Sequence, residues 1–298
     1  MTGWHPLGPQ LADVLRDGGL DPALVEQVIR RALDEDLALG PDVTTAATVP
    51  AGARATGDVV PRAPGVLAGV PVAAAVFGLV GGDDVEVALH AADGMAARTD
   101  APVLTVEGPT RALLTAERTA LNLVGHLSGV ATVTRRWVDA VTGTGAAIRD
   151  TRKTLPGLRV LEKYAVRCGG GVNHRMALGD AALVKDNHVA AAGGITAAVE
   201  AVRTAAPDVP LEVECDTLDQ VREAIAAGVE LVLLDNFPLA DTRAAVELVR
   251  GTGVRLEASG GLSLERAAEV AATGVDYLAV GALTHSAAVL DLGFDLRL

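Results

Sequence analysis

The sequence predicts an α/β protein with two parts, a smaller N-terminal α+β domain and a barrel of parallel strands and helices. The first observation is that six short apolar runs in the second half alternate with helical patterns. This rhythm is typical of repeated βα units and favours a barrel. The second observation is that polar residues follow these runs, as expected for the functional strand ends of such a barrel. The third is that the first part, about 110 residues long, lacks the rhythm and shows short strands punctuated by glycine and proline.

The expected barrel strands are 146–148, 181–184, 211–213, 231–234, 254–258 and 277–280, and the clearest barrel helices are 195–205, 218–227, 242–250 and 264–272. In the first part, strands are expected at 57–60, 85–89 and 103–106, and a long helical stretch, 109–127, joins the two parts. The last residues alternate leucine or phenylalanine with polar residues and glycine, which predicts a half-buried strand. We expect this strand to return to the sheet of the small domain.

Residues 63–82 carry no charge over a length that could span a membrane. Pro71 interrupts this run, and glycine and alanine dilute it. A buried strand followed by a helix that begins at Pro71 therefore fits better than a membrane span.

Composition excludes several classes of function. The net charge of −13 argues against binding to nucleic acid or to an anionic membrane, and the 2% aromatic content argues against a surface for stacking bases or sugars. Cys168 and Cys215 lie far apart, with no cysteine or histidine cluster nearby, so neither a disulfide framework nor a zinc site is indicated. No signal-peptide core precedes the first helix, and a cytoplasmic location is expected.

Residues 149–188 break the acidic trend, with eight basic and four acidic side chains. Focused positive potential in an acidic protein predicts a highly charged anionic ligand. Arg152, Lys153 and Lys185 follow predicted strand ends and favour this interpretation. The four-residue spacing of Arg159, Lys163 and Arg167 instead favours the solvated face of a helix.

Glycine patterns agree with an anionic ligand. Residues 169–171 are three glycines, and Ser259, Gly260 and Gly261 follow a predicted strand, with Gly281 after the next one. Glycine lets main-chain N–H groups approach a phosphate, although turns alone would also explain each site. The late βα loops are frequent phosphate sites in α/β barrels.

Two carboxylates, Glu214 and Asp235, stand at predicted strand ends, and Glu212 shares the strand face of Glu214. Carboxylates beside phosphate-binding cations suit Mg²⁺ or sugar hydroxyls. The alternative is a structural ion pair with a barrel lysine. Cys215 lacks a histidine partner and is expected to be a small packed residue.

Several motifs, in order along the chain, closely resemble the quinolinate phosphoribosyltransferase family (carboxylating nicotinate-nucleotide pyrophosphorylase). The motifs are Glu35-Asp36 with 42–45 (DVTT), 117–122 (ERTALN), 150–154 (DTRKT), 169–171 with 173–175 (NHR), 185–188 (KDNH), 212–214 (EVE), 234–236 (LDN) and 257–261 (EASGG). Pro41 and Ala177 depart from the usual pattern, and neither removes a charged site residue.

The resemblance implies an open α/β barrel of the type II phosphoribosyltransferases. Its expected bounds are residues 1–125 for the N-terminal α+β domain, joined by a C-terminal strand at about 287–298, and 126–286 for the barrel. The implied enzyme is a pentosyltransferase of NAD biosynthesis. It converts quinolinate and phosphoribosyl pyrophosphate to nicotinate mononucleotide, pyrophosphate and CO₂, uses Mg²⁺, and works as a homodimer with shared active sites.

The same resemblance implies roles for twelve residues. Arg118, Arg152, His174, Arg175 and Lys185 would hold the substrate carboxylates, and Lys153 would lie close to both substrates and to the pyrophosphate. Glu214 and Asp235 would engage the ribose and Mg²⁺, and with Lys153 they are the expected catalytic residues. Ser259, Gly260, Gly261 and Gly281 would bind the 5′-phosphate.

Three alternatives remain at the level of sequence. They are a nicotinate phosphoribosyltransferase, a paralogue encoded with molybdate transport genes, and a barrel that binds a phosphorylated ligand without catalysis. A monocarboxylate would need fewer cations than the chain supplies. A purely binding barrel would leave Lys153, Glu214 and Asp235 unexplained.

Overall fold

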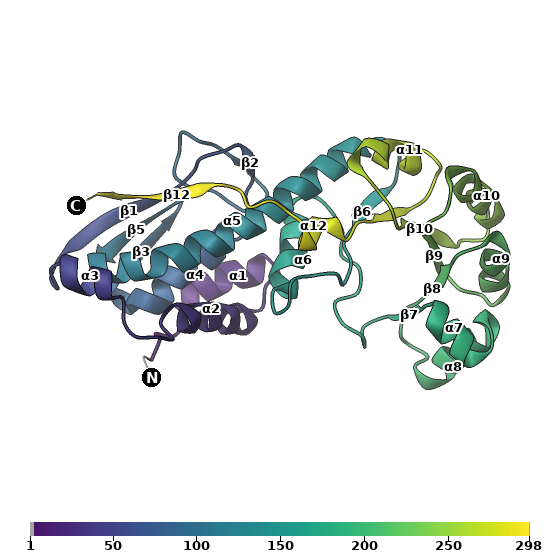
Figure 1. Ribbon diagram of the computed structural model, residues 1–298, viewed down its shortest axis with the longest axis horizontal. Coiled ribbons are helices and arrows are strands. Elements are labelled where there is room, and N and C mark those ends of the chain that lie inside the picture. Colours follow the sequence, from purple (N-terminus) through teal and green to yellow (C-terminus); the bar gives the residue numbers. More distant parts are fainter. Residues whose placement is uncertain (1–2, 298) are drawn as a thin grey trace. The chain divides into compact units, whose positions relative to one another are not determined.

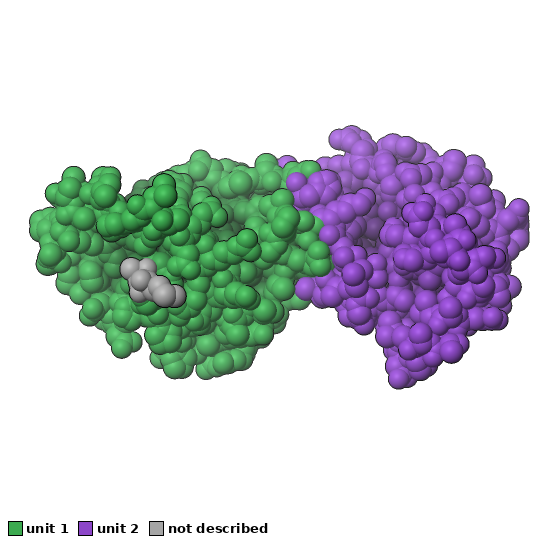
Figure 2. Space-filling view, turned by 60° about the horizontal axis from the view of Figure 1, so that its bottom comes forward, with its two compact units in different colours: residues 1–135, 154–170, 286–298 green, residues 136–153, 171–285 purple. Residues whose placement is uncertain are grey.

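The computed structural model describes residues 3–297, which form two compact units (Figure 2). Unit 1 comprises the described residues up to Arg135, together with 154–170 and 286–297, and unit 2 comprises 136–153 and 171–285. From the sequence, the boundary between the two domains was predicted at residue 125, with 154–170 in the barrel. In the structure, the helix in that segment packs within unit 1.

Unit 1 is built on an antiparallel sheet with the strand order β12-β1-β5-β3 (Figure 1). Its strands are β1 (Arg54–Pro61), β3 (Glu86–Leu89), β5 (Leu104–Pro109) and β12 (Leu292–Arg297), and a separate pair joins β2 (Gly65–Val66) to β4 (Ala96–Ala97). β12 pairs with β1 along its whole length, as the alternating pattern at the end of the chain predicts.

The helices of unit 1 begin where the sequence offers caps. They are α1 (Pro9–Asp17), α2 (Pro22–Asp36), α3 (Val43–Thr48), α4 (Val70–Gly81), the short η1 (Gly82–Asp84), α5 (Thr110–Ala140) and α6 (Arg159–Cys168), and the last residues of α5 are counted with unit 2. Asp21 accepts a hydrogen bond from the Ala23 N–H at the start of α2, and a proline opens α4. Most of α4 is buried, and Phe77 on this helix stacks against Phe294 of β12 with the ring centroids 5.6 Å apart.

The uncharged stretch 63–82 therefore contributes β2 and the buried helix α4. Across residues 3–297, we find no helix that combines the length and the apolar character needed to cross a membrane.

Unit 2 contains six parallel strands in the order β6-β11-β10-β9-β8-β7. The strands are β6 (Ala147–Arg149), β7 (Ala182–Val184), β8 (Leu211–Cys215), β9 (Leu231–Asp235), β10 (Arg255–Ser259) and β11 (Tyr277–Ala279). The helices are α7 (Asp186–Ala192), α8 (Ile195–Ala205), α9 (Leu218–Ala226), α10 (Leu239–Val249), η2 (Leu264–Arg266), α11 (Ala267–Ala271) and α12 (Ala282–His285). Because β6 and β7 stand at opposite edges of the sheet, the barrel is open, as expected from the resemblance.

The strand register places charged side chains on one face of this sheet. Glu214, Leu233, Glu257 and Tyr277 lie side by side on neighbouring strands. Two residues further along the strands, a second row runs through Asp235, Ser259, Ala279 and Arg149. Alternate residues of a strand point to the same side, so both rows face the same way. This face carries the site described below.

One interpretation from the sequence is wrong. Lys163 does not lie on a solvated helix face, because its side chain is fully buried within unit 1, although the neighbouring Arg167 is exposed. Gly169 and Gly170 end α6, and a Cβ on Gly169 would lie 2.6 Å from the Ala131 carbonyl oxygen of α5. Packing and helix termination therefore explain these two glycines without a ligand.

The close approach at Gly129 gives a test of the packing in unit 1. A Cβ at this position of α5 would lie 2.0 Å from the Ala288 carbonyl oxygen, whereas a Cβ at Gly78 of α4 would have no described heavy atom within 4 Å. Gly129→Ala should lower the free energy of unfolding by about 1–3 kcal/mol. Gly78→Ala should raise it by about 0.5–1 kcal/mol, because alanine favours a helix more than glycine does. Urea unfolding of both variants checks the prediction, and equal effects would contradict it.

Candidate active site

The carboxyl ends of the unit 2 strands bring together eleven of the twelve residues expected at the site. Arg152 and Lys153 follow β6, and Lys185 follows β7. Glu214 and Asp235 stand at the ends of β8 and β9. The remaining unit 2 residues are His174, Arg175, Ser259, Gly260, Gly261 and Gly281. Arg118 is the exception, since it is exposed on α5 in unit 1.

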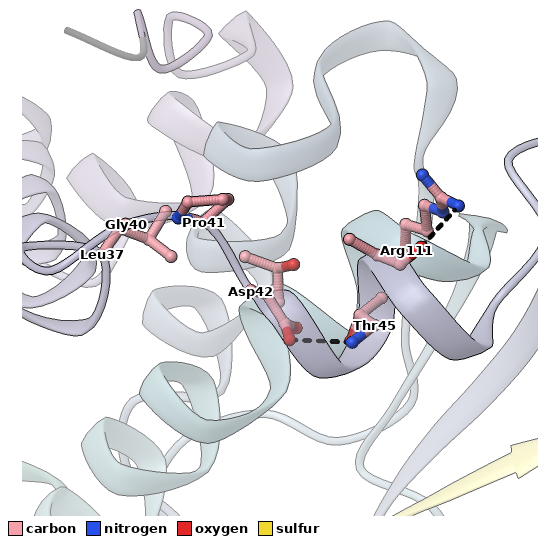
Figure 3. A pocket seen from close by; sticks show the side chains of 8 residues that line it. Leu37, Gly40, Pro41, Asp42, Thr45 and Arg111 are labelled. Carbon is pink, nitrogen blue, oxygen red and sulfur yellow. Dashed lines mark hydrogen bonds between the residues drawn. The ribbon is translucent and has the colours of Figure 1, made fainter.

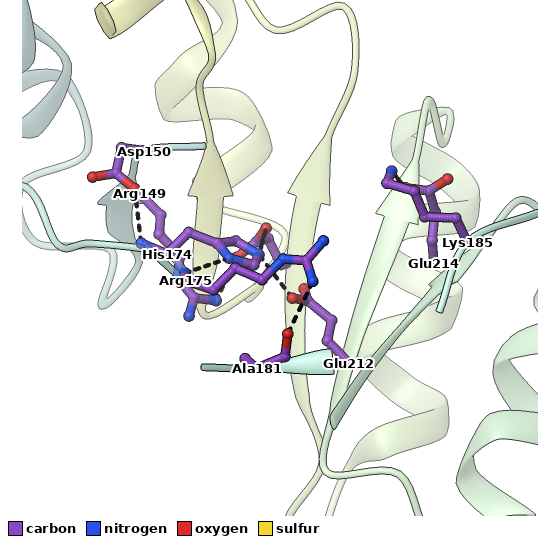
Figure 4. Close-up of polar contacts among 9 residues, drawn as sticks. Arg149, Asp150, His174, Arg175, Ala181, Lys185, Glu212 and Glu214 are labelled. Carbon is purple, nitrogen blue, oxygen red and sulfur yellow. Dashed lines mark hydrogen bonds and ion pairs between the residues drawn. The ribbon is translucent and has the colours of Figure 1, made fainter. Parts of the chain in front are cut away.

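Glu214 and Lys185 form an ion pair across neighbouring strands, with Oε2 of the carboxylate accepting from Nζ (Figure 4). The lysine side chain keeps 45% of its surface exposed, against 13% for the glutamate. A structural ion pair with a barrel lysine was the alternative to a magnesium or sugar site for this carboxylate. An exposed lysine head at a strand end can equally bind an anion, so the pair is compatible with a functional site.

Asp235 accepts a hydrogen bond from the Asn236 side chain at 2.8 Å and is not buried. Together with Glu214 it offers carboxylate oxygens at the ends of adjacent strands. Oxygen donors of this kind fit Mg²⁺, which retains several of its own waters and binds through one or two carboxylates and substrate phosphates. The donor set therefore suits the metal that the resemblance implies.

The loop after β10 has the main-chain conformation expected for close approach to an anion. Gly260 and Gly261 have φ of +84° and +58°, a region that favours glycine, and Asn236 on the neighbouring loop has φ of +54°. A Cβ on Gly260 would lie 2.2 Å from Oδ1 of Asn236. A side chain at this position would therefore push the two loops apart.

Lys153 is exposed, and its loop is held at two points. Its N–H donates to Oγ1 of Thr151 at 3.0 Å, and its carbonyl accepts from the Thr284 hydroxyl at 2.9 Å. The ideal Cβ position at Gly281 lies only 3.0 Å from Cδ of Lys153, so glycine leaves room for the lysine stem. Gly281 thus contributes to the site at least by allowing the lysine to pass.

His174 lies in a buried polar cluster beneath these strand ends (Figure 4). The main-chain N–H of His174 donates to Oδ1 of Asp150 at 2.8 Å, and the ring Nδ1 accepts from the main-chain N–H of Arg175 at 2.7 Å. Nε2 lies 2.8 Å from Oε2 of Glu212 and 3.6 Å from Oε1 of Glu257. Both ring nitrogens are therefore engaged within the protein.

Arg149 completes the cluster. Its Nη1 lies 2.7 Å from Oε2 of Glu257, and its guanidinium carbon lies 4.8 Å from the centre of the Tyr277 ring. From the sequence, Glu257 was noted only as the first residue of the 257–261 motif, and no role was predicted for Arg149. The sequence does hold a signal for both residues. Arg149 lies next to Asp150 at one predicted strand end, and Glu257 lies two residues before Ser259 at another, where alternate side chains share a face.

Burial shifts the ionisation of this cluster. Desolvation raises the pKa of Glu212 to about 7, although Arg149 and Arg175 oppose the change. The pKa of Glu257 is also raised to about 7, first by burial and then by the charge of Glu212. Burial and the charge of Arg152 lower the pKa of Arg175, which still leaves a cation at neutral pH.

The first motif of the resemblance, around Glu35-Asp36 and 42–45, lies in unit 1. Asp42 and Thr45 of this motif line a pocket beside Arg111 of α5 (Figure 3), and its volume is about 520 Å³. Asp42 caps α3 by accepting from the Thr45 N–H at 2.9 Å, and Asp36 accepts from the Thr119 hydroxyl at 3.1 Å. The motif thus contacts the stretch of α5 that carries Arg118.

Comparison with known proteins matches both units. The family models described as quinolinate phosphoribosyl transferase, N-terminal domain and C-terminal domain, match residues 42–128 and 130–295. A carboxylating nicotinate-nucleotide pyrophosphorylase of Mycobacterium leprae is 59% identical over 286 residues, which cover 95% of this chain and 100% of the relative.

Solved structures agree. The nicotinate-nucleotide pyrophosphorylase of Francisella tularensis superposes with a TM-score of 0.88 at 37% identity, covering 92% of this chain and 96% of that one. Human nicotinic acid phosphoribosyltransferase gives a TM-score of 0.56 at 17% identity, covering 89% of this chain and 73% of that one, and so shares the fold alone. The comparisons confirm the predicted family and give no support to the alternatives.

The raised pKa of Glu257 predicts how stability depends on pH. In the unfolded chain the group titrates near 4.5, and in the folded chain near 7, so between these values the folded state binds more protons. Stability contributed by Glu257 should therefore fall as pH rises from about 4.5 to about 7. Glu257→Gln removes the titrating group and should flatten the dependence. Melting temperatures of both proteins from pH 5.5 to 8 check this, and parallel curves would contradict it.

Proposed function

Because the chain belongs to the quinolinate phosphoribosyltransferase family, we propose a division of labour among its site residues for the reaction of that family. The chain is a decarboxylating pentosyltransferase of NAD biosynthesis. It joins quinolinate to the phosphoribosyl group of phosphoribosyl pyrophosphate and yields nicotinate mononucleotide, pyrophosphate and CO₂.

The observation that carries the residue roles is the group of cations at the strand ends of an acidic chain. Arg152, Arg175 and Lys185 supply positive charge for the two carboxylates of quinolinate. Arg118 adds a fourth cation, supplied by a second copy of the chain. His174 was expected in this group, but its ring nitrogens are engaged within the protein.

The 5′-phosphate is assigned to Ser259, Gly260, Gly261 and Gly281, because the left-handed main chain of the glycine loop exposes N–H groups. Lys153 faces the departing pyrophosphate and stabilises the negative charge that develops on it. Glu214 and Asp235 lie where they can favour the positive charge that develops on the ribose ring.

Glu214 and Asp235 are also the residues that would hold Mg²⁺, together with phosphate oxygens of the substrate. When bound, the metal neutralises part of the pyrophosphate charge. In the first chemical step the ring nitrogen of quinolinate bonds to the anomeric carbon, and the bond to pyrophosphate breaks with its electron pair. The bond between the ring carbon and its carboxylate then breaks, and the electron pair stays on that carbon as CO₂ leaves. The neighbouring cationic nitrogen stabilises this pair, and the carbon takes up a proton.

A homodimer with shared sites and a cytoplasmic location complete the proposal. Arg118 lies in unit 1, whereas the other proposed cations lie in unit 2, and two-fold symmetry would give two equivalent mixed sites. Cys168 and Cys215 are both free thiols, which suits a reducing compartment.

Substrate selectivity tests the dicarboxylate site. A substrate that lacks one carboxylate leaves desolvated cations unpaired, at a cost of roughly 1–3 kcal/mol or more. Quinolinate should release both pyrophosphate and CO₂ in a coupled assay with phosphoribosyl pyrophosphate, and nicotinate should give no comparable pyrophosphate release. Calorimetry should show tighter binding of quinolinate, and equal affinities would count against two bound carboxylates.

Hybrid dimers test the proposed origin of Arg118. Lys153→Ala should lower turnover on the order of 10²–10³-fold, as expected for loss of one preorganised charge, and Arg118→Ala should also be nearly inactive. After random exchange of the two variants, half of the dimers are hybrids with one intact site, so activity should return to about a quarter of wild type. Mass spectrometry verifies exchange. Verified hybrids without activity would show that Arg118 serves its own subunit.

A further inference from the structure

The hydrogen bonds around His174 determine which ring nitrogen carries the proton. Nδ1 lies 2.7 Å from the main-chain nitrogen of Arg175. A main-chain N–H can only donate, so Nδ1 must be the unprotonated acceptor. The ring proton therefore sits on Nε2 and points at Oε2 of Glu212, 2.8 Å away.

This arrangement leaves the His174 ring no N–H group to offer a substrate, and only 8% of the residue is exposed. Its effect on the substrate has to pass through Arg175, whose main chain it holds. The guanidinium of Arg175 is fixed separately, because Nη1 donates to the Ala181 carbonyl at 2.9 Å. Arg175 is thus held at both its backbone and its head, with further guanidinium donors for a carboxylate.

Beneath the ring lie two buried carboxylates, Glu212 with 3% exposure and Glu257 with none. Burying two such groups is costly unless cations and donors compensate. Arg149 supplies the cation at 2.7 Å from Glu257, and the His174 Nε2–H lies between the two carboxylates. Within residues 3–297, Oε1 of each glutamate accepts no hydrogen bond and Nε of Arg149 donates none, so the buried charges are held mainly by the Arg149–Glu257 and His174–Glu212 contacts.

His174, Glu212 and Glu257 could also be viewed as three ligands of a metal, since one donor atom of each lies within 4.8 Å of the others. Two facts argue against this. Nε2 bears a proton, and Glu257 is already paired with Arg149, so the protein's own cations occupy the positions that a metal charge would take. The cluster is better explained as an internal support.

We propose that Glu257 is a positioning residue for the quinolinate site: paired with Arg149, it keeps Glu212 and the His174 ring in place, and the ring in turn fixes Arg175. This inference rests on the proposed role of Arg175 in binding quinolinate. Glu257 itself touches no substrate. Its loss should affect quinolinate while leaving phosphoribosyl pyrophosphate, which the Gly260 loop binds, almost unaffected.

Steady-state kinetics with each substrate varied in turn test this selectivity. Glu257→Ala should raise KM for quinolinate roughly 10- to 100-fold, the size expected for one lost charge-assisted hydrogen bond, with KM for phosphoribosyl pyrophosphate within about threefold. Glu257→Gln keeps an acceptor for Arg149 and should restore KM for quinolinate to within about threefold of wild type. Calorimetric binding of quinolinate alone should follow the same order.

Two further variants complete the design. Asp276 directly precedes β11, and its carboxylate accepts from the main-chain N–H of Leu256 in β10. Asp276→Ala removes this bond, which involves no side chain of the cluster, and should leave both KM values unchanged. If Glu257→Ala does not fold, Glu257→Asp carries the test, because it keeps the charge but withdraws the carboxylate from His174, and should raise KM for quinolinate alone.

An unchanged KM for quinolinate in folded Glu257→Ala or Glu257→Asp would overturn the proposal, and so would equal increases for both substrates. Wild-type protein that binds no quinolinate would instead overturn the proposed function, and this inference with it.

Discussion

Arg149 and Glu257 pair inside the barrel although a strand lies between them. Arg149 ends β6 and Glu257 belongs to β10, and Tyr277 of the intervening β11 places its ring 4.8 Å from the guanidinium. The buried cluster depends on this pair, because Arg149 supplies the positive charge that offsets the burial of Glu257, and Glu257 lies beside the His174 ring. Only 2% of the residues in the chain are aromatic, so few other large side chains are available to fill this space.

The strand ends of unit 2 carry the two kinds of charge, positive and negative, at different strands. Cations follow β6 and β7, the two edge strands of the open sheet, whereas the carboxylates of Glu214 and Asp235 end the inner strands β8 and β9. Lys185, which follows β7, and Glu214, at the end of β8, form an ion pair where the two kinds of charge meet. A chain with a net charge of −13 can hold this local positive potential because its acidic residues lie mostly elsewhere.

Sequence reasoning found the parallel strands, their order along the chain and most of the polar strand ends, because alternation and βα rhythm are local signals. It missed the role of Arg149 and Glu257, since their pairing depends on the spatial order β6-β11-β10, which no local pattern encodes. Lys163 was misjudged for a related reason. Its four-residue spacing resembles an exposed helix face, but α6 packs inside unit 1 and buries this lysine completely.

The pairing of β12 with β1 has a consequence for synthesis on the ribosome. Strand β1 begins at Arg54, yet its partner β12 spans Leu292–Arg297, so this edge of the unit 1 sheet stays open until more than 230 further residues have been translated. Every strand of unit 2 emerges before that closing strand. An unpaired edge is a template for unwanted association, and the nascent chain is therefore exposed to it until β12 has emerged and paired with β1.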